Sequence, residues 1–324
     1  MAPYFVSDKR ALYLVVLPIK SILNPDLNFA LQVHNWLMSL EGNFDVMHEV
    51  TTSFDLITVK QNDKLLLMIR LIDLRRWIAY QGQAREELTG FKSKQEEIRR
   101  AGISFVTLWE DVWIREKSIV KSRLNAMLGI SQRIPARMTK VRRIDKITAD
   151  EFLNANHLQH TVSSKIKYGL FLPNQYFRVL KADKQLDRTL SELLVAVATF
   201  SNPRVFKRDE KPFRSYELIR FANLLDTTVV GGFDKLLSFF EEDCRPDDIM
   251  TYADLEWSDG ASYKRLGFEA VSEKSSMSYQ LNTETNERYS SLKDHDSSNL
   301  IEIYNGGSRK FVKEVLASYH TTSL

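Results

Sequence analysis

Cysteine is the scarcest residue type in this chain of 324 residues, which contains Cys244 alone. One thiol excludes an intrachain disulfide and any cysteine-rich zinc site. The acidic residues around Cys244 are expected to raise the pKa of its thiol, and a thiol that stays protonated is a poor nucleophile. We therefore interpret Cys244 as an ordinary loop or core residue.

Long apolar runs are also missing. The longest, such as residues 12–18 and 65–69, fall far short of the roughly 20 residues that a membrane-spanning helix needs. The chain does not open with the charged, apolar and cleavage regions of a signal peptide. The hydrophobic content of 44% can nevertheless fill two cores at this length. We expect a cytoplasmic protein of two domains without membrane contact.

The net charge of +3 conceals an asymmetry along the chain. Residues 1–143 hold 22 Lys and Arg against 15 Asp and Glu, whereas the remainder holds 23 against 27. Residues 115–143 contain nine basic side chains and one acidic one, a pattern that fits a DNA-binding surface or a solvated helix face. The side chains that would contact DNA phosphates there are Arg115, Lys121, Arg123, Arg133, Arg137, Lys140, Arg142 and Arg143.

Hydrophobic patterns of the strand and helix types alternate along the chain and indicate a mixed α/β (α+β) fold. The elements expected first are helices at residues 27–40, 83–100 and 119–128, strands at 54–60, 64–71 and 103–108, and a strand or short helix at 14–22. The elements expected later are strands at 168–172, 193–200, 216–223, 249–253 and 276–281, and helices at 148–156, 232–242 and 261–266.

One helix start and two connecting segments complete this organisation. Thr148, with Glu151 three residues later, predicts the start of one helix through a capping box. Residues 132–140 are typical of a linker or of an arm that lies on DNA, and residues 290–298 of a mobile loop. We therefore place a basic domain at residues 1–143 and a second domain at residues 144–324.

The most specific motif is Val229-Val230-Gly231-Gly232, where a short apolar strand runs into two glycines and then a helix. Such a helix start presents free backbone N–H groups and the positive end of the helix dipole, which favour a pyrophosphate. Further along, Tyr263-Lys-Arg-Leu-Gly-Phe268 ends a short helix with a glycine. Over about half of the chain, these segments resemble the GNAT N-acyltransferase superfamily, whose loop usually carries an Arg or Gln and a third small residue.

The GNAT resemblance implies a donor and a site for it. The cofactor would be acyl-CoA or another activated acyl donor, and the hydroxyl of Tyr263 would give a proton to the leaving thiolate. The residues expected to hold the donor are Val229, Val230, Gly231, Gly232 and Lys235.

A closer resemblance is to the Mom-type DNA-modification proteins of phages, a GNAT-like branch. The matching segments are residues 156–159, 167–171, 198–204, 217–221, 229–232 and 252–260. The resemblance implies that the central strands splay to form a cleft for donor and acceptor. Glu217 or Asp254 would act as general base on an exocyclic amine, and Arg220 or Arg204 would hold a phosphate or carboxylate.

Two further groups of residues were considered for this cleft. His157 and His160 have the spacing of a metal pair on one helical face, but no third ligand stands nearby in the sequence. We therefore expect no metal and interpret His157 as a polar contact to the substrate. An enzyme that acts on a base in a duplex would flip it out, and Trp257, Phe233 and Tyr252 are the candidates for stacking on it.

Residues 102–113 and 119–124 resemble the very-short-patch-repair endonucleases, a fold also found in phage homing enzymes. Catalysis in such nucleases requires carboxylates on adjacent strands around a divalent metal. Asp55 is a candidate for the first, but the next strand has Met68 and Arg70 where the second should fall. We interpret residues 1–143 as a degenerate form of this nuclease that binds DNA.

Three hypotheses follow. The favoured one is a DNA-modifying transferase that moves an acyl or aminoacyl-type group onto an amine of a DNA base, itself already modified or not. The first alternative is a phage homing or repair endonuclease, with Asp73, Glu110 and Asp111 as remaining carboxylates beside Asp55. The second is a DNA-binding protein without catalysis. The resemblances favour a phage or mobile-element setting in a bacterial cell.

Overall fold

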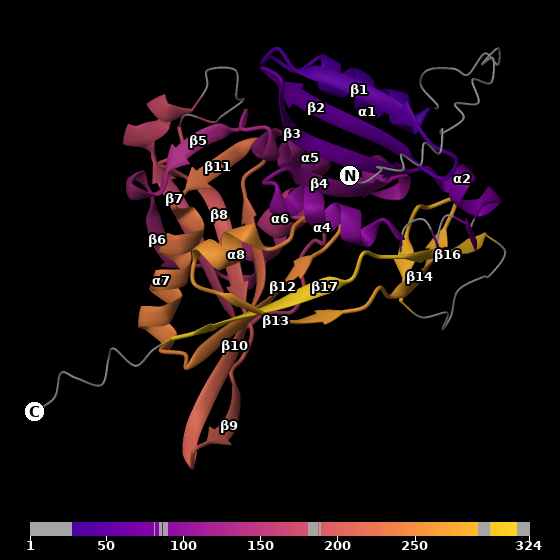
Figure 1. Ribbon diagram of the computed structural model, residues 1–324. Coiled ribbons are helices and arrows are strands. Elements are labelled where there is room, and N and C mark those ends of the chain that lie inside the picture. Colours follow the sequence, from indigo (N-terminus) through magenta and orange to yellow (C-terminus); the bar gives the residue numbers. More distant parts are fainter. Residues whose placement is uncertain are drawn as a thin grey trace, which may run out of the picture.

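The computed structural model describes residues 28–80, 82, 83, 86, 90–180, 187, 189–290 and 299–315. It has the expected mixed α/β fold, with two large sheets that both contain parallel and antiparallel pairs (Figure 1). The element expected at residues 14–22, and residues 291–298 of the expected loop, lie outside the described residues. None of the described helices is long and apolar enough to cross a membrane.

The first sheet has the strand order β1-β2-β3-β4 and lies at the top of Figure 1. Its strands are β1 (Asp45–Val50), β2 (Asp55–Gln61), β3 (Lys64–Ile72) and β4 (Ser104–Trp109). The predicted hairpin of β2 and β3 is confirmed, and its turn residues Asn62 and Asp63 both have positive φ, as this tight turn requires. β4 runs parallel to β3, and the crossover contains α2 (Leu74–Ala79) and α4 (Lys92–Arg100).

Alternation along β3 separates the two faces of this sheet. Ile69 is fully buried in a core with α1 (Phe29–Met38) and α5 (Glu110–Met127). Its neighbour Arg70 points to the opposite face, because successive strand residues alternate. There it bonds to Thr107 of β4 and Gln95 of α4.

The second sheet has the strand order β13-β17-β12-β10-β8-β7-β6, and β9 pairs with β10. Its strands are β6 (Lys140–Arg143), β7 (Ile166–Pro173), β8 (Glu192–Phe200), β9 (Arg204–Arg208), β10 (Lys211–Asn223), β12 (Asp248–Asp254), β13 (Glu269–Lys274) and β17 (Ser308–Glu314). α7 (Gly232–Cys244) packs on one face through Phe240, which stacks on Phe200 of β8 at 3.8 Å between ring centroids. α6 (Lys146–Asn156) packs on the other face, where its Leu153 meets Val197.

The structure corrects the expected linker at residues 132–140. These residues form β5 (Gln132–Pro135), the 3₁₀ turn η2 (Ala136–Met138) and the first residue of β6. β5 pairs in parallel with β11 (Thr227–Val230), and β6 pairs with β7. The partner of β5 lies almost a hundred residues further along, so a local pattern did not reveal it.

Two helix starts also differ from the expectation. α5 begins at Glu110 rather than at residue 119, because Trp113 is buried and anchors the preceding turns in the core. α6 is capped by Asp145 instead of Thr148: the Asp145 carboxylate accepts a hydrogen bond of 2.8 Å from the backbone N–H of Thr148. Asp and Thr are both common N-caps, so the sequence alone allowed either Asp145 or Thr148 to begin this helix.

The expected strand at residues 276–281 belongs to a third sheet, inserted between β13 and β17. Its order is β15-β14-β16, with β14 (Ser278–Asn282), β15 (Arg288–Tyr289) and β16 (Leu300–Tyr304). Leu281 and Ile303 of this sheet pack with Trp77 and Trp109 of the first part of the chain. Residues near the C-terminal end of the sequence therefore complete a core that is otherwise built from residues 54–109.

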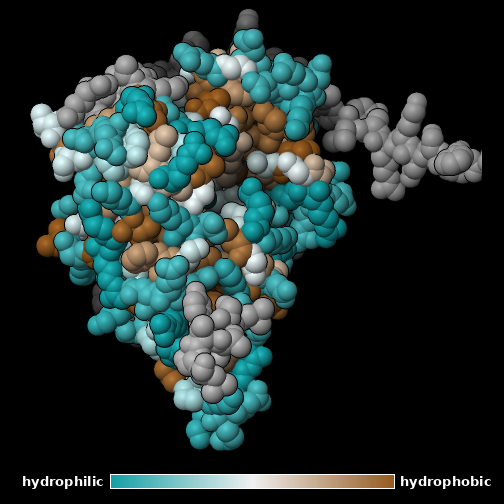
Figure 2. All heavy atoms as spheres, turned by 90° about the vertical axis from the view of Figure 1, so that its left-hand side faces the viewer, coloured by the Kyte–Doolittle hydropathy of each residue, from teal (hydrophilic) through white to brown (hydrophobic). Residues whose placement is uncertain are grey.

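The hairpin of β9 and β10 extends away from the rest of the fold at the bottom of Figure 1. All five residues of β9 are exposed, including Val205 and Phe206. Figure 2 shows the side of the molecule with β5, β6 and α7; it is mainly hydrophilic, with scattered apolar residues.

Candidate active site at the split between β10 and β12

A cleft opens where β10 and β12 separate. The two strands pair in parallel only at residues 215–217 and 248–250. Beyond this point β10 pairs with β8, while β12 stays paired with β17 along its whole length. A register shift between Leu218 and Arg220 marks the point of divergence, and the hydroxyl of Thr251 donates to the carbonyl of Leu218 across it (3.0 Å). The cavity has a volume of about 1060 Å³, which is large enough for a sizeable ligand.

The glycine motif lies at one end of this cleft, at the start of α7. Gly231 is the N-cap and has a φ of +77°, a left-handed conformation that favours glycine. A Cβ on Gly232 would lie 2.7 Å from a methyl group of Val229, so this turn has no room for a side chain. Val229, Val230 and Gly231 line the cavity.

Two neighbouring charged residues of α7 have different surroundings. The ammonium group of Lys235 donates to the carbonyls of Ala136 (3.0 Å) and Thr139, and thereby fastens α7 to the η2 segment. It does not line the cleft, and the role expected for it as a donor ligand has no support in its position. Asp234 does line the cleft in the first turn of α7, where its carboxylate already complements the helix dipole.

Tyr263 lines the cleft from α8 (Ala261–Arg265). Its ring packs among Phe233, Phe268 and Phe311, with centroid distances of 5.5 to 5.8 Å. Burial raises the pKa of the Tyr263 hydroxyl above its usual value, although its hydrogen bond with Thr251 opposes this. The hydroxyl is therefore protonated at neutral pH and can donate a proton.

The two expected carboxylates, Glu217 and Asp254, both line the cleft, one on each diverging strand. Asp254 accepts hydrogen bonds from the side chain of Gln159 (3.2 Å) and the backbone N–H of Glu256 (2.9 Å). Burial nevertheless raises its pKa. Such a carboxylate is a stronger base than an ordinary aspartate, which suits general-base work on an amine.

Glu256 is a neighbour that the sequence did not single out. It is buried, and burial together with the charge of Asp254 raises its pKa to about 8. Its carboxyl group accepts a hydrogen bond of 2.8 Å from the indole of Trp109. The carboxyl group of Glu256 is therefore mostly protonated and uncharged at neutral pH. Asp254, beside it, faces the cleft.

His157 and Arg220 also line the cleft. Burial and the guanidinium groups of Arg123 and Arg220 lower the pKa of His157 to about 3, so its ring is neutral. The Nδ1 atom accepts from the backbone N–H of Gln159 (3.1 Å), which leaves the hydrogen on Nε2. His157 is thus a hydrogen-bond donor to a ligand rather than a base.

His160 pairs with a carboxylate instead of sharing a metal with His157. Its Nε2 atom lies 2.7 Å from Glu116, beside a kink in α5. The carbonyl of His160 accepts a hydrogen bond of 3.0 Å from Arg220, which fixes the Arg220 side chain at the edge of the cleft.

The three aromatic residues proposed for base stacking have different surroundings. Trp257 is buried in the core of the first sheet, and the guanidinium of Arg123 lies 4.9 Å from its ring centroid, so it is not free to stack on a base. Phe233 stacks on Phe221 at 4.6 Å. Tyr252 is partly exposed and keeps one ring face toward Lys274.

The basic residues expected to bind DNA do not form one stripe. Arg115, Arg123 and Arg133 line the cleft, the last from β5. Arg142 and Arg143 form ion pairs with Glu192 and Asp243. The remaining four lie apart: Lys121 over the ring of Trp113, Arg137 and Lys140 on the η2 and β6 segment, and Arg204 on the extended hairpin.

Arg133 lies in a strand, not in the linker or arm that the sequence predicted. It stands opposite Thr228 in the β5–β11 pair, directly before the glycine turn, and lines the cleft. Its position there follows from the parallel pairing of β5, for which the sequence carried no local signal.

The candidate nuclease carboxylates have partners within the protein. Asp55 forms an ion pair with Arg76 and lies 3.3 Å from His48. Asp73 caps α2, and Glu110 accepts a hydrogen bond of 2.9 Å from the backbone of Leu74.

Asp111 is held by Arg288, whose Nε and Nη2 atoms lie 2.6 and 2.9 Å from its two oxygens. A guanidinium therefore occupies both oxygens of this buried carboxylate. Among the described residues, His, Cys, Asp and Glu side chains form no group of three arranged to hold a metal ion.

No protein-family model matches this chain, and no curated protein matches it in sequence. Among solved structures, the chain is similar to NAA60 of Arabidopsis thaliana bound to a bisubstrate analogue, with 10% identity over 55% of this chain and 99% of that one and a TM-score of 0.32. It is also similar to the histone acetyltransferase HPA2 and related acetyltransferase from Corynebacterium glutamicum, with 12% identity over 56% and 99% of the chains and a TM-score of 0.30. A third is a KacTA–DNA complex, with 16% identity over 51% and 92% and a TM-score of 0.27.

Proposed function

We propose that this protein is a GNAT-like transferase that moves an acyl or aminoacyl-type group from acyl-CoA, or another activated donor, onto an amine of a DNA base. The observation that carries the transferase is the split between β10 and β12, which opens a cavity bordered by a glycine turn, a protonated tyrosine and a carboxylate. The strand order of the second sheet and its single short parallel pair support the GNAT resemblance.

The donor part of the proposal rests on the start of α7. The αL glycine starts α7 at the cavity, and the first backbone N–H groups of a helix have no partner within the helix, so a pyrophosphate can bind there. Arg133 supplies a cation beside this turn and offsets the adjacent charge of Asp234. When bound, the donor would supply an activated carbonyl carbon and a thiolate leaving group.

The side chains of the cleft can handle the two protons that amide formation requires. A new C–N bond and a broken C–S bond leave one proton to remove from the amine and one to add to the thiolate. Asp254 is the better candidate for the first task because burial raises its pKa, with Glu217 on the opposite strand as the alternative. Tyr263 is the candidate for the second, and its protonated hydroxyl lines the same cavity.

The acceptor is the least constrained part. Arg115, Arg220 and the Nε2–H of His157 offer donors to a phosphate or a polar base edge inside the cleft. The wall that contains Arg115 belongs to α5, so the first sheet and its helices contribute directly to the cleft. We propose that residues 1–143 serve DNA binding rather than cleavage, since their candidate metal ligands already have protein partners.

The test is nucleoside mass analysis of DNA from cells that express the full chain, the Asp254→Asn variant, or the control variant Asp187→Asn, whose carboxylate is exposed and bonds only locally to Thr189. We expect a heavier nucleoside in the first and third samples and its loss in the second. The mass difference identifies the transferred group.

A second arm covers a substrate base that is already modified. The purified protein is incubated with unmodified and phage-modified DNA in the presence of acyl-CoA. The proposal is contradicted if no product forms with either DNA, or if Asp254→Asn forms the product as well as the wild-type protein does. Failure of the wild-type protein to bind duplex DNA at low salt contradicts the DNA acceptor alone.

A further inference from the structure

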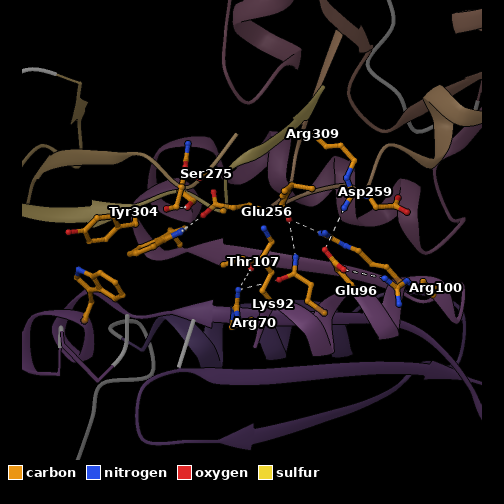
Figure 3. Close-up of a pocket in the computed structure, with 18 of the residues that line it drawn as sticks. Arg70, Lys92, Glu96, Arg100, Thr107, Glu256, Asp259, Ser275, Tyr304 and Arg309 are labelled. Atoms are coloured by element: carbon orange, nitrogen blue, oxygen red, sulfur yellow. Dashed lines mark hydrogen bonds and ion pairs between the residues drawn. The ribbon is translucent and has the colours of Figure 1, made fainter. Parts of the chain in front are cut away.

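A second cavity adjoins the cleft, with which it shares Glu256 and Asn305, and lies between the first sheet and the C-terminal part of the second. Its volume is about 430 Å³, which falls in the range of about 300–1,000 Å³ typical of small-molecule sites. Its walls come from β3, β4 and α4, from the loop after β12, and from the connection between β16 and β17. Figure 3 shows its charged side chains on one side and Tyr304 at the other.

Cations outnumber carboxylates around this cavity. The cationic side chains that line it are Arg70, Lys92, Arg99, Arg100, Lys264 and Arg309. The carboxylates are Glu96, Glu256 and Asp259. Since burial raises the pKa of Glu256 to about 8, this group offsets little of the positive charge at neutral pH.

Arg70 is the most unusual of these cations. Its side chain is 5% exposed, and its Nη2 atom donates to Thr107 (2.9 Å) and Gln95. Its Nε and Nη1 atoms have no hydrogen-bond partner among the described residues. Burial lowers the pKa of Arg70 to about 10. Its guanidinium carbon lies 5.3 to 5.7 Å from the ring centroids of Phe54, Phe91 and Phe105, but no carboxylate among the described residues pairs with it, so an anion in the cavity would further stabilise its charge.

Arg99 of α4 is in a similar situation. Its Nη2 atom donates to the backbone carbonyls of Phe105 (2.8 Å) and Leu255 (2.9 Å) rather than to a carboxylate. Burial lowers its pKa to about 10 as well. Two guanidinium groups bonded to neutral acceptors thus face one cavity, which concentrates positive potential there.

The opposite end of the cavity is aromatic. Trp77 and Trp109 form an edge-to-face pair at 5.0 Å, and Tyr304 lies 6.3 Å from Trp77. Both indole N–H groups are already used, by the carbonyl of Glu302 and the carboxyl group of Glu256. Trp77 and Trp109 are almost fully buried, so the partly exposed ring of Tyr304 is the aromatic surface that a ligand can contact.

We propose that this cavity binds a small phosphate-bearing molecule with a planar ring, of the nucleoside monophosphate class. The phosphate lies toward Arg70, Arg99 and Arg100, and the ring lies against Tyr304. The site adjoins the cleft proposed for acyl transfer, because Glu256 and Asn305 line both, but it does not depend on that function.

The test is calorimetric titration of the full chain with AMP, with adenosine and with inorganic phosphate. We expect saturable binding of AMP with a Kd at or below about 1 mM, weaker binding of phosphate, and no binding of adenosine. Arg100→Glu and Lys92→Glu, at the exposed rim of the cavity, should each weaken AMP binding at least about tenfold, because they replace an attraction with a repulsion.

Three further variants make the result specific. Arg178→Glu reverses an exposed charge away from both cavities and should leave AMP binding unchanged. Arg133→Glu reverses an exposed charge on the wall of the cleft and should also leave AMP binding unchanged. Arg70→Met removes the buried cation and should abolish binding if circular dichroism shows that the variant folds; if it does not fold, the two rim variants decide.

Two outcomes overturn the proposal. One is the absence of saturable AMP binding to the wild-type protein. The other is AMP binding that is lost in Arg133→Glu but kept in Arg100→Glu and Lys92→Glu, since the nucleotide then occupies the cleft.

Discussion

The two large sheets each contain one parallel strand pair, and the pairs differ in how far they stay together. β3 and β4 remain in register from Leu67–Ser104 to Ile72–Trp109. β10 and β12 are in register only from Ser215–Asp248 to Glu217–Met250 and then separate. The closed pair buries Ile69 and Val106 completely, whereas the open pair leaves the cleft.

The difference shows in the polar side chains near each pair. Close to the closed pair, Asp55, Glu110 and Asp111 bond to groups of the protein itself. In the open pair, Glu217 and Asp254 face a cavity that can take a ligand. These carboxylates beside the closed pair thus have partners inside the protein, whereas the open pair leaves room for an external partner.

The largest expected effect concerns chemistry in the open pair. Tyr263→Phe keeps the aromatic packing but removes the hydroxyl, so the rate of product formation should fall about 10²–10⁴-fold with unchanged stability. Tyr176→Phe is the control, because Tyr176 is half-buried on η3 (Asn174–Val179), away from the cleft. Rates from quenched time courses of modified nucleoside check both variants; equal rates for Tyr263→Phe and wild type would exclude the tyrosine as proton donor.

The next effect compares one substitution in the two pairs. Ile69→Ala empties a fully buried site in the closed pair and should lower the free energy of unfolding by about 2–5 kcal/mol. Ile219→Ala, on the cleft wall of the open pair, should cost only about 1 kcal/mol because its side chain is already partly exposed. Urea titrations measure both values. Similar losses would mean that the cleft wall is packed as tightly as the closed pair.

The sequence identified what depends on neighbours along the chain. The hairpin of β2 and β3 was predictable because a polar turn separates two apolar runs, and the start of α7 because two glycines follow Val229-Val230. The residues Glu217, Asp254, Tyr263, Arg220 and His157 were expected together, and all of them line one cleft.

What the sequence concealed depends on contacts between distant segments. Arg288 reaches Asp111 across 177 positions, and β5 finds β11 almost a hundred residues later. The aromatic side chain of Trp257 suggested base stacking, but it is buried in the core of the first sheet, whose residues are distant in the sequence. The second cavity is assembled from segments that lie far apart in the sequence, so no local motif marks it.

A smaller effect concerns the buried glutamate between the two cavities. The pKa of Glu256 is about 8 in the folded chain and 4.5 in the unfolded one. The unfolded state therefore ionises first, and the free energy of unfolding should fall as the pH rises from about 4.5 to about 8. Glu256→Gln should flatten this fall, and the exposed Glu210→Gln should not. Chemical denaturation at several pH values measures the slopes; the same slope for Glu256→Gln and wild type would assign the pH dependence to other groups.

The smallest effect extends the comparison of satisfied and open groups to the surface. Arg142 already has a partner in Glu192 at 2.8 Å, whereas in the described part of the chain no carboxylate pairs with Arg137. If both sides of this edge approach DNA, Arg137→Gln should reduce the slope of log K against log salt by about 0.9, the value for one phosphate contact. Arg142→Gln should leave that slope unchanged and lower stability by only about 0.2–1 kcal/mol, since exposed ion pairs contribute little. Fluorescence anisotropy on a labelled duplex at four salt concentrations separates the two. An equal change of slope for both variants would show that DNA displaces Glu192 from Arg142, and the arginine pair would then act together on the backbone.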